Sequence, residues 1–304
     1  MNIHFSNVNF SSNSGPNTFA HRLANCLTKM GHNIVNQDDD YQIFLAFIEA
    51  SSTPKKNAKV IQRLDGIWFK PDEFHTHNKN IKALYDYADS VIWQSEFDKN
   101  MTEHHWGKKF GKVIHNGASL ERKNASNDTI RQIRNSYKKV FVCSANWHRQ
   151  KRLKENVELF LKMKEVFPDS CLIVMGPNPD FYARHKDILY TGAISHDLCL
   201  QIFSIADWMI HLAWLDHCPN VVVESLSQGC PVICTDSGGT KELVRDNGLV
   251  IPENTPYHYE LTDYDNPYGL ELELPSLPDV VFDNSYIDIK KVAKKYVDAM
   301  IGEK

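Results

Sequence analysis

The sequence lacks any apolar run that could cross a membrane, because none of its windows approaches the roughly 18 consecutive apolar residues that a spanning helix needs. Its first residues also lack the basic segment and the long apolar run that together make a secretory signal peptide. We therefore expect a cytoplasmic protein with no transmembrane segment.

The chain has little net charge and no obvious disulfide pattern. A formal net charge of -4 argues against a general nucleic-acid binder, although it is compatible with a local basic cleft. The seven cysteines are an odd number, and Cys143, Cys171 and Cys234 lie inside apolar runs that are typical of core strands. We interpret them as reduced thiols in a globular protein, not as a disulfide framework.

The loop after the first predicted strand lacks the G-x-G-x-x-G fingerprint of dinucleotide-binding proteins. The strand covers residues 2–5, and the Ser/Asn-rich stretch after it contains Gly15 just before a helical pattern. Without the fingerprint, a nicotinamide-dependent dehydrogenase is a poor candidate. Gly15 can be a turn glycine or can border a bound ligand, and both interpretations stay open.

Short apolar runs alternate with amphipathic helical patterns along the whole chain, which predicts an α/β protein with parallel sheets. A length of 304 residues allows two domains of roughly 150 residues each. Residues 118–138 are polar and poor in core residues, so we place the domain boundary there. We expect an N-terminal domain over 1–120, a second domain over 121–285 and a C-terminal helix over 286–304. Strands are expected at 2–5, 42–47, 59–64, 90–94 and 112–114, and at 140–144, 171–175, 190–192, 208–212, 231–235 and 249–251.

The richest local pattern lies at 217–250, HCPNVVVESLSQGCPVICTDSGGTKELVRDNGLV. Pro219 can open a helix, since its missing N–H would have no partner there, and Gly229 can close that helix in a left-handed conformation. A short buried strand over 231–235 then leads into Asp236-Ser237-Gly238-Gly239, where two glycines let backbone approach a ligand closely.

Two features near this pattern predict an anion site. The start of the helix offers free N–H groups and a positive dipole end at Asn220, Val221 and Val222. The turn NWHRQKR, which follows a predicted core strand, holds the cations Arg149 and Lys151. An Arg fork suits bidentate phosphate contacts and a Lys adds a mobile point charge, so the turn can clamp a diphosphate.

Asp216 is followed after seven residues by Glu224, and the chain continues with S-L-S-Q-G-C-P-V-I-C-T and G-G-T-K-E. This order resembles the donor-site signature of family 4 retaining glycosyltransferases, the glycosyl transferases group 1. Both acidic positions are usually Glu in that family, whereas the first is Asp216 here. The resemblance is strong over 140–251 and weak over 1–118. It implies a GT-B fold, in which two Rossmann-like domains with parallel sheets face a central cleft, and retaining transfer of a sugar from a nucleotide-sugar.

The resemblance also implies roles for individual residues. Glu224 would accept hydrogen bonds from the ribose hydroxyls, and Asp216 would hold the transferred sugar. Lys151 and Arg149 would stabilise the departing β-phosphate. Family members usually have Gly-Arg near the strand end and then Lys-Gly, so Arg149 comes late here and Arg152 stands where Gly is usual.

Further ligand contacts are expected where other strands end, because ligands of parallel sheets bind beyond the carboxyl ends of the strands. By resemblance, Gly15, Gly176 and Asn116 would help to bind the donor, and Asn116 lies in V-I-H-N-G, which is similar to the segment that closes the first domain in this family. Asp65, in R-L-D-G, can hold an acceptor hydroxyl or can cap a turn, and the sequence leaves both open.

No metal site is expected. Asp38-Asp39-Asp40 and Asp263-Tyr264-Asp265 contain the Asp-x-Asp spacing with which metal-dependent GT-A glycosyltransferases hold a cation, but neither follows a strong apolar strand near a phosphate loop. His75-x-His77 and His104-His105 lack the Cys or acidic partners of a zinc site. We therefore expect metal-independent chemistry without a cofactor, in which a UDP- or GDP-linked sugar is the co-substrate.

Several assignments stay open at this point. His211 and His217 flank the donor motif and can contact sugar hydroxyls or form buried hydrogen bonds. The acceptor can be a carbohydrate, a lipid-linked molecule or a protein, and no nucleic-acid partner is expected. Within the same fold, a nucleotide-sugar epimerase or hydrolase is an alternative. A nucleotide-sugar-binding protein with a degenerate site is another, and Asp216 in place of Glu favours it.

Overall fold

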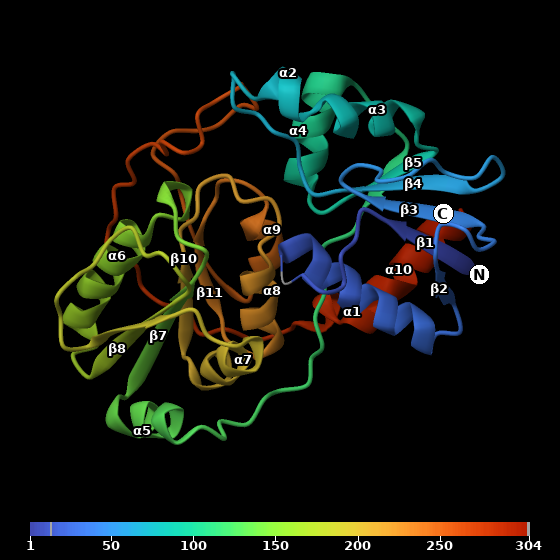
Figure 1. Cartoon of the computed structure of the whole chain (residues 1–304). Helices are drawn as coiled ribbons and strands as arrows, with labels where there is room; N and C mark the ends of the chain where they lie inside the picture. The colour runs from blue at the N-terminus through green and yellow to red at the C-terminus, as the bar shows by residue number, and fades with distance from the viewer. Residues whose placement is uncertain (13, 303–304) are drawn as a thin grey trace. The chain divides into compact units, whose positions relative to one another are not determined.

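Two six-stranded parallel sheets, each in its own unit of the chain, make up the computed structural model, which describes residues 1–12 and 14–302 (Figure 1). The first unit comprises residues 1–119, 258–263 and the chain from 286 onward, and the second comprises 120–257 and 264–285. The parallel pairing and the helical connections between strands confirm the predicted α/β fold class.

The first unit has the strand order β2-β1-β3-β4-β5-β6. One face of this sheet packs on α1 and α10, where Phe19 and Tyr296 share a core with Leu45, and Figure 1 shows these two helices side by side. On the other face, Phe44 packs with Leu84 of α3. The elements are β1 (Asn2–Ser6), α1 (Gly15–Lys29), β2 (Asn33–Val35), β3 (Ile43–Phe47), β4 (Lys59–Leu64), α2 (Phe74–His77), α3 (Lys79–Tyr87), β5 (Ser90–Trp93), α4 (Glu96–Trp106), β6 (Gly111–Val113) and α10 (Ile289–Ile301).

The second unit has the strand order β12-β11-β10-β7-β8-β9. Its chain runs outward from β7 through β8 to β9 and then returns to pair β10 with the free side of β7. The elements are α5 (Asp128–Ser136), β7 (Lys139–Ser144), the 3-10 turn η1 (Arg149–Lys151), α6 (Leu153–Val166), β8 (Ser170–Met175), β9 (Ile188–Gly192), α7 (His196–Ile205), β10 (Trp208–His211), α8 (Asn220–Ser227), β11 (Val232–Thr235), α9 (Thr240–Val244) and β12 (Gly248–Ile251).

The core strands of the second unit are buried on both faces, as parallel strands between helices should be. Phe141 and Cys143 of β7 point into the core formed with α6, whose Phe160 and Met163 pack there. The cysteines predicted to be core thiols are free and buried. Burial raises the pKa of the Cys171 and Cys234 thiols to about 12, so both stay protonated at neutral pH.

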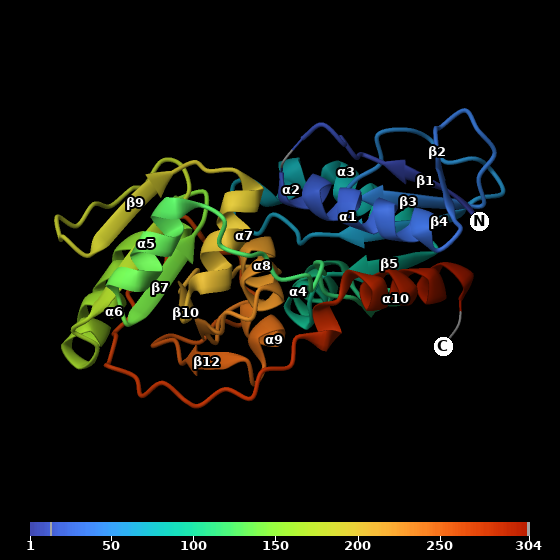
Figure 2. The ribbon, with the colours of Figure 1, turned by 90° about the horizontal axis from the view of Figure 1, so that it is seen from below.

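An extended strap over residues 264–285 completes the second unit without forming a helix or strand of its own, apart from the start of a 3-10 turn at Ser285. It passes beside β12 in Figure 2, and Leu272 and Leu277 pack against the α6 side of the core. Lys162 of α6 donates to the Leu272 carbonyl at 2.6 Å. The strap therefore covers part of the apolar core of the second unit.

A buried arginine in the turn after β7 pairs with Glu253 and also bonds to this strap. The Arg152 guanidinium is fully buried and donates to both carboxylate oxygens of Glu253, at 2.6 and 3.0 Å. It also donates to the Tyr268 carbonyl of the strap at 2.9 Å. Arg152 has a left-handed φ of +52°, a conformation that glycine adopts most easily. This backbone conformation explains why glycine is usual at this position in the resembled family. The arginine side chain adds the contacts to Glu253 and Tyr268.

Four short elements were missed by the sequence prediction: β2, α2, α5 and α9. Helix α5 lies inside the polar stretch assigned to the domain boundary, and Ile130 is its one buried residue. The helix begins after Asn127, whose side chain caps it by accepting a hydrogen bond from the Ile130 N–H at 3.2 Å. The helix offers only two apolar residues, Ile130 and Ile133, in a polar stretch, and such a short pattern does not predict a helix.

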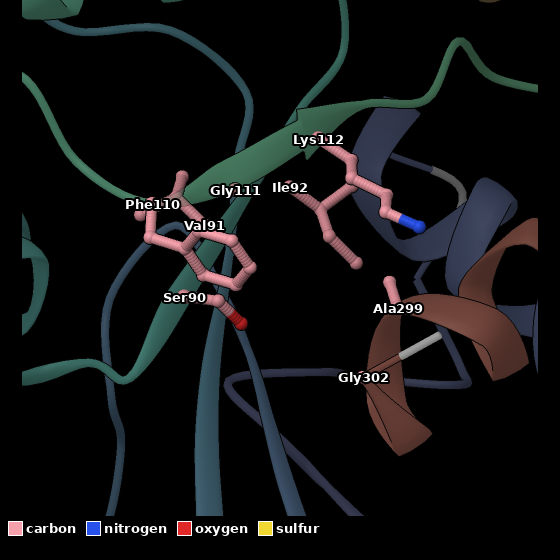
Figure 3. A pocket seen from close by; sticks show the side chains of 8 residues that line it. All are labelled: Ser90, Val91, Ile92, Phe110, Gly111, Lys112, Ala299 and Gly302. Atoms are coloured by element: carbon pink, nitrogen blue, oxygen red, sulfur yellow. The ribbon is translucent and has the colours of Figure 1, made fainter. Parts of the chain in front are cut away.

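A small cavity of about 90 Å³ in the first unit lies beside the end of α10 (Figure 3). Figure 3 shows the side chains of Ile92 and Ala299 pointing toward one another across it. The lining residues are Ser90, Val91, Ile92, Phe110, Gly111, Lys112, Ala299 and Gly302. Ser90 and Gly111 begin β5 and β6, so the cavity lies at the amino ends of the strands, away from the edge where ligands of parallel sheets bind.

The buried Arg152–Glu253 pair predicts a large stability effect. Arg152→Ala should lower the free energy of unfolding by about 3–5 kcal/mol, because it leaves a buried carboxylate without its cation. Arg152→Gly should recover about 1 kcal/mol of this loss, since glycine tolerates the positive φ. Urea unfolding monitored by tryptophan fluorescence measures both changes.

Lys154→Ala is the matched control, because its 3.6 Å contact with Glu158 lies on the surface of α6. Exposed pairs of this kind contribute less than about 1 kcal/mol. If Arg152→Ala unfolds at the same urea concentration as Lys154→Ala, the buried ion pair does not stabilise the fold.

Candidate functional site

The strand order of the second unit predicts where a ligand binds. The connections after β7 and β10 lead to opposite sides of the sheet, which makes the carboxyl ends of these neighbouring strands a topological switch point. Open α/β sheets bind their ligands at such points. The turn after β7 contains Arg149 and Lys151, and the loop after β10 contains Asp216, so the predicted catalytic residues come from the two sides of the switch point.

Lys151 and Asp216 meet in an ion pair, in which the ammonium contacts Oδ2 of the carboxylate. Burial by itself raises the pKa of Asp216, but the charge of Lys151 outweighs this effect and holds the pKa far below its usual value. Asp216 is therefore ionised at any pH near neutrality. The structure brings together two of the three predicted catalytic residues.

His211, the last residue of β10, faces the same carboxylate oxygen. Its Nε2 lies 3.4 Å from Asp216 Oδ2 and makes no hydrogen bond to the residues that the structure describes. The side chain is only 4% exposed. Burial lowers the pKa of the imidazole more than the nearby carboxylate raises it, so His211 is neutral at neutral pH.

The backbone of the Asp216 loop is fitted against Gly238. A Cβ at Gly238, where φ is +67°, would lie 2.5 Å from the Asp216 carbonyl oxygen and 2.8 Å from its nitrogen. The next residue, Gly239, donates its N–H to the same carbonyl at 2.8 Å. We predicted that these glycines let backbone approach a ligand, and the structure shows that Gly238 makes room for the backbone that carries Asp216.

Helix α8 carries Glu224 on a buried part of its surface. Glu224 Oε1 lies 3.1 Å from Nε2 of His196, the first residue of α7, whose side chain is half exposed. At the start of α8 the Val222 N–H donates to the Pro219 carbonyl at 3.1 Å, so one of the three N–H groups predicted for phosphate already has a partner. Asn220 and Val221 are partly exposed.

Arg149 and Gly176 occupy different surroundings in the second unit. Arg149 is exposed in the 3-10 turn η1, where its guanidinium can reach a ligand in solution. Gly176 follows β8 with a φ of +116°, and a Cβ there would lie 1.8 Å from the Ala145 carbonyl oxygen. The visible role of Gly176 is thus close packing beside the end of β7, and its contact with a donor remains a prediction.

The remaining predicted residues lie in the first unit, where a buried arginine joins two of them. Arg63 forms an ion pair with Asp65 and donates to Asn116 Oδ1 at 2.7 Å. Asn116 in turn donates to Gln94 Oε1 at 2.8 Å. These side chains fix the carboxyl ends of β4, β5 and β6 to one another, which gives Asp65 and Asn116 a structural role. Gly15 is exposed and is the first residue of α1.

Four residues in these networks escaped the sequence prediction: Arg63, Arg152, His196 and Glu253. Arg63 lies inside an apolar strand, which is an unusual place for a charge and is the one available signal. The partners of Arg152 and His196 are 101 and 28 residues away along the chain, so local patterns carry no trace of them.

Among residues 1–12 and 14–302, no group of three or more His, Cys, Asp or Glu side chains is arranged to hold a metal ion. In the same part of the chain, no helix has both the length and the apolar character that crossing a membrane requires.

Comparison with known proteins supports the resemblance noted in the sequence. Residues 126–260 match the family described as glycosyl transferases group 1. A protein of Methanocaldococcus jannaschii described as an uncharacterised glycosyltransferase is 24% identical over 193 residues, which cover 59% of this chain and 47% of that protein. The match thus spans less than half of that relative's length.

Solved structures resemble the whole chain. Anabaena HepE, in a complex with UDP-glucose, superimposes with a TM-score of 0.60 at 14% identity, over 99% of this chain and 95% of that one. AviGT4, a glycosyltransferase involved in avilamycin A biosynthesis, gives a TM-score of 0.64 at 13% identity, over 99% and 98% of the two chains. This structural likeness establishes the GT-B fold. Because the sequence identities are so low, it says nothing about the ligands of this chain.

The family match covers the part of the chain in which the site lies. It includes the turn after β7, the Lys151–Asp216 pair, helix α8 with Glu224 and the Gly238-Gly239 loop. Residues 126–260, less than half of the chain, thus resemble the glycosyl transferases group 1 family.

Proposed function

We propose that this protein is a retaining glycosyltransferase that moves a sugar from a nucleotide-sugar to an acceptor. The observation that carries the proposal is the Lys151–Asp216 pair at the switch point of a sheet whose helix α8 presents Glu224. A cation for a diphosphate, a carboxylate for a sugar and a carboxylate for a ribose then lie in one unit. The acceptor is a carbohydrate, a lipid-linked molecule or a protein.

In this proposal, the residues act mainly by stabilising the charges that develop in the transition state. As the bond between the anomeric carbon and the β-phosphate oxygen breaks, negative charge grows on the phosphate and positive charge grows on the sugar. Lys151 and the exposed Arg149 stabilise the phosphate charge, and the positive end of α8 adds to it. Asp216 is ionised and accepts a hydrogen bond from the transferred sugar. A single well-placed donor in such a site is worth roughly 3 kcal/mol of activation energy.

The donor is a UDP- or GDP-linked sugar in this proposal. UDP-glucose is the first candidate to test, because HepE, which shares the fold, was solved in complex with it. A nucleotide-sugar-binding protein without turnover is the second candidate function. It is favoured by the aspartate at position 216, whose carboxylate is already engaged by Lys151.

The two acidic residues should separate binding from turnover. Asp216→Asn should keep the affinity for UDP or GDP at the wild-type level or above it, because the substitution frees Lys151 for the phosphates. It should lower the rate of nucleotide release from the sugar donor about 10- to 150-fold, the value of one charge-assisted hydrogen bond. Glu224→Gln should instead weaken diphosphate and sugar donor alike, because an amide offers the ribose one acceptor and an unwanted donor.

Titration calorimetry and initial rates measure these effects, with Glu158→Gln on the exposed face of α6 as the control. Loss of diphosphate binding in a folded Asp216→Asn protein would contradict the assigned roles. Tight diphosphate binding by the wild type without turnover of any donor would favour the binding protein.

Gly238→Ala should misplace Asp216, since the added methyl group would overlap its backbone. A displacement of about 1 Å at a catalytic group costs about 100-fold in rate. Gly192→Ala is the matched control, because Gly192 has a similar φ of +65° but no atom within 4 Å of an added Cβ. Initial rates should fall for Gly238→Ala only, and equal rates for both variants would show that the close fit is unimportant.

Turnover should persist in the presence of EDTA, because Lys151, Arg149 and the start of α8 supply the positive charge that a diphosphate needs. The measurement is the rate of nucleotide release before and after dialysis against the chelator. A loss of activity that manganese restores would refute metal independence. It would direct attention to the acidic runs at 38–40 and 263–265.

A further inference from the structure

One oxygen of Asp216 is shared by two basic side chains. Lys151 contacts Oδ2 directly, while His211 Nε2 lies 3.4 Å from the same atom without hydrogen-bonding geometry. Among the residues that the structure describes, these are the two basic side chains within 4 Å of the carboxylate. The buried Nε2 of His211 therefore lies next to the Lys151–Asp216 ion pair but makes no hydrogen bond to it.

This arrangement matters when a diphosphate enters, in the function proposed above. The phosphates compete with Asp216 for Lys151, and a buried carboxylate that loses its cation is strongly destabilised unless another donor takes over. A nitrogen that is already buried costs no further desolvation when it moves the last few tenths of an ångström into a hydrogen bond. Forming that bond also satisfies Nε2, which otherwise has no partner.

We propose that His211 is the reserve partner of Asp216: its Nε2–H hydrogen-bonds the carboxylate when Lys151 turns to the diphosphate of the donor. His211 is thus a positioning residue, and it acts through Asp216 and Lys151 without touching the substrate. The role requires the neutral tautomer that carries its proton on Nε2. The proposal rests on the proposed function, because it presupposes that Lys151 binds a diphosphate.

Removing the donor nitrogen should trap Lys151 on Asp216. In His211→Met, an apolar chain of similar length fills the site, so UDP or GDP should bind about tenfold more weakly, the order expected for one lost hydrogen bond to a charged group. His211→Gln, whose amide places an N–H near the position of Nε2, should bind the diphosphate like the wild type. The measurement is titration calorimetry with UDP and with GDP on the full chain.

A double-mutant cycle separates this role from a general structural one. In an Asp216→Asn background no carboxylate retains Lys151, so adding His211→Met should leave diphosphate affinity unchanged. A folding defect caused by His211→Met would instead persist in that background. His4→Met is the matched control, because His4 is also a nearly buried histidine at 9% exposure but belongs to β1 of the other sheet.

The wild-type protein provides a measurement that does not depend on the Met variant folding. With ¹⁵N-labelled histidine, the Nε2 resonance of His211, assigned by its absence in His211→Gln, should move to the position of a hydrogen-bonded N–H on saturation with UDP or GDP. An unmoved resonance, or equal affinities for wild type and His211→Met, overturns the proposal. Failure of the wild type to bind either diphosphate overturns the proposed function itself, and the inference falls with it.

Discussion

The ion pair between Lys151 and Asp216 is the interaction on which the site depends. Each partner comes from a different side of the switch point, so the pair joins the turn after β7 to the loop after β10. Burial would make either charge costly alone, and together they keep Asp216 ionised. A donor diphosphate carries the charge that can compete for Lys151, which makes the pair both a structural contact and a preformed anion site.

Both backbone conformation and side-chain hydrogen bonds position the segments around the Lys151–Asp216 pair. Gly238 leaves room for the Asp216 backbone, and Arg152 adopts a left-handed conformation beside Lys151. The Asn156 side chain donates to the carbonyls of both Lys151 and Arg152, at 3.0 and 2.9 Å, while its Oδ1 accepts from the Leu212 N–H at 3.1 Å. These contacts set the Lys151 turn against the loop after β10 before any ligand arrives.

Much of this architecture could be predicted from the sequence, because parallel strands and their helices repeat a strong apolar pattern. Asp216 and Glu224 could be singled out because their spacing resembles a known donor-site signature, and Lys151 by the same resemblance together with its place after a buried strand. The Arg152–Glu253 pair could not, since its partners are 101 residues apart along the chain. Asp65 and Asn116 were noticed as ligand residues, yet what joins them is Arg63, a charge hidden inside an apolar strand.

The central claim is that the second unit binds a nucleotide-sugar through Lys151. Thermal unfolding of wild type and Lys151→Ala, with and without a panel of UDP- and GDP-sugars, tests it most directly. A ligand present at 100 times its dissociation constant should stabilise the wild type by about 2.7 kcal/mol. At the same ligand concentration, the account predicts a clear rise in melting temperature for the wild type with at least one donor and a much smaller rise for Lys151→Ala. Equal shifts for the two proteins, or no shift with any donor, would contradict it.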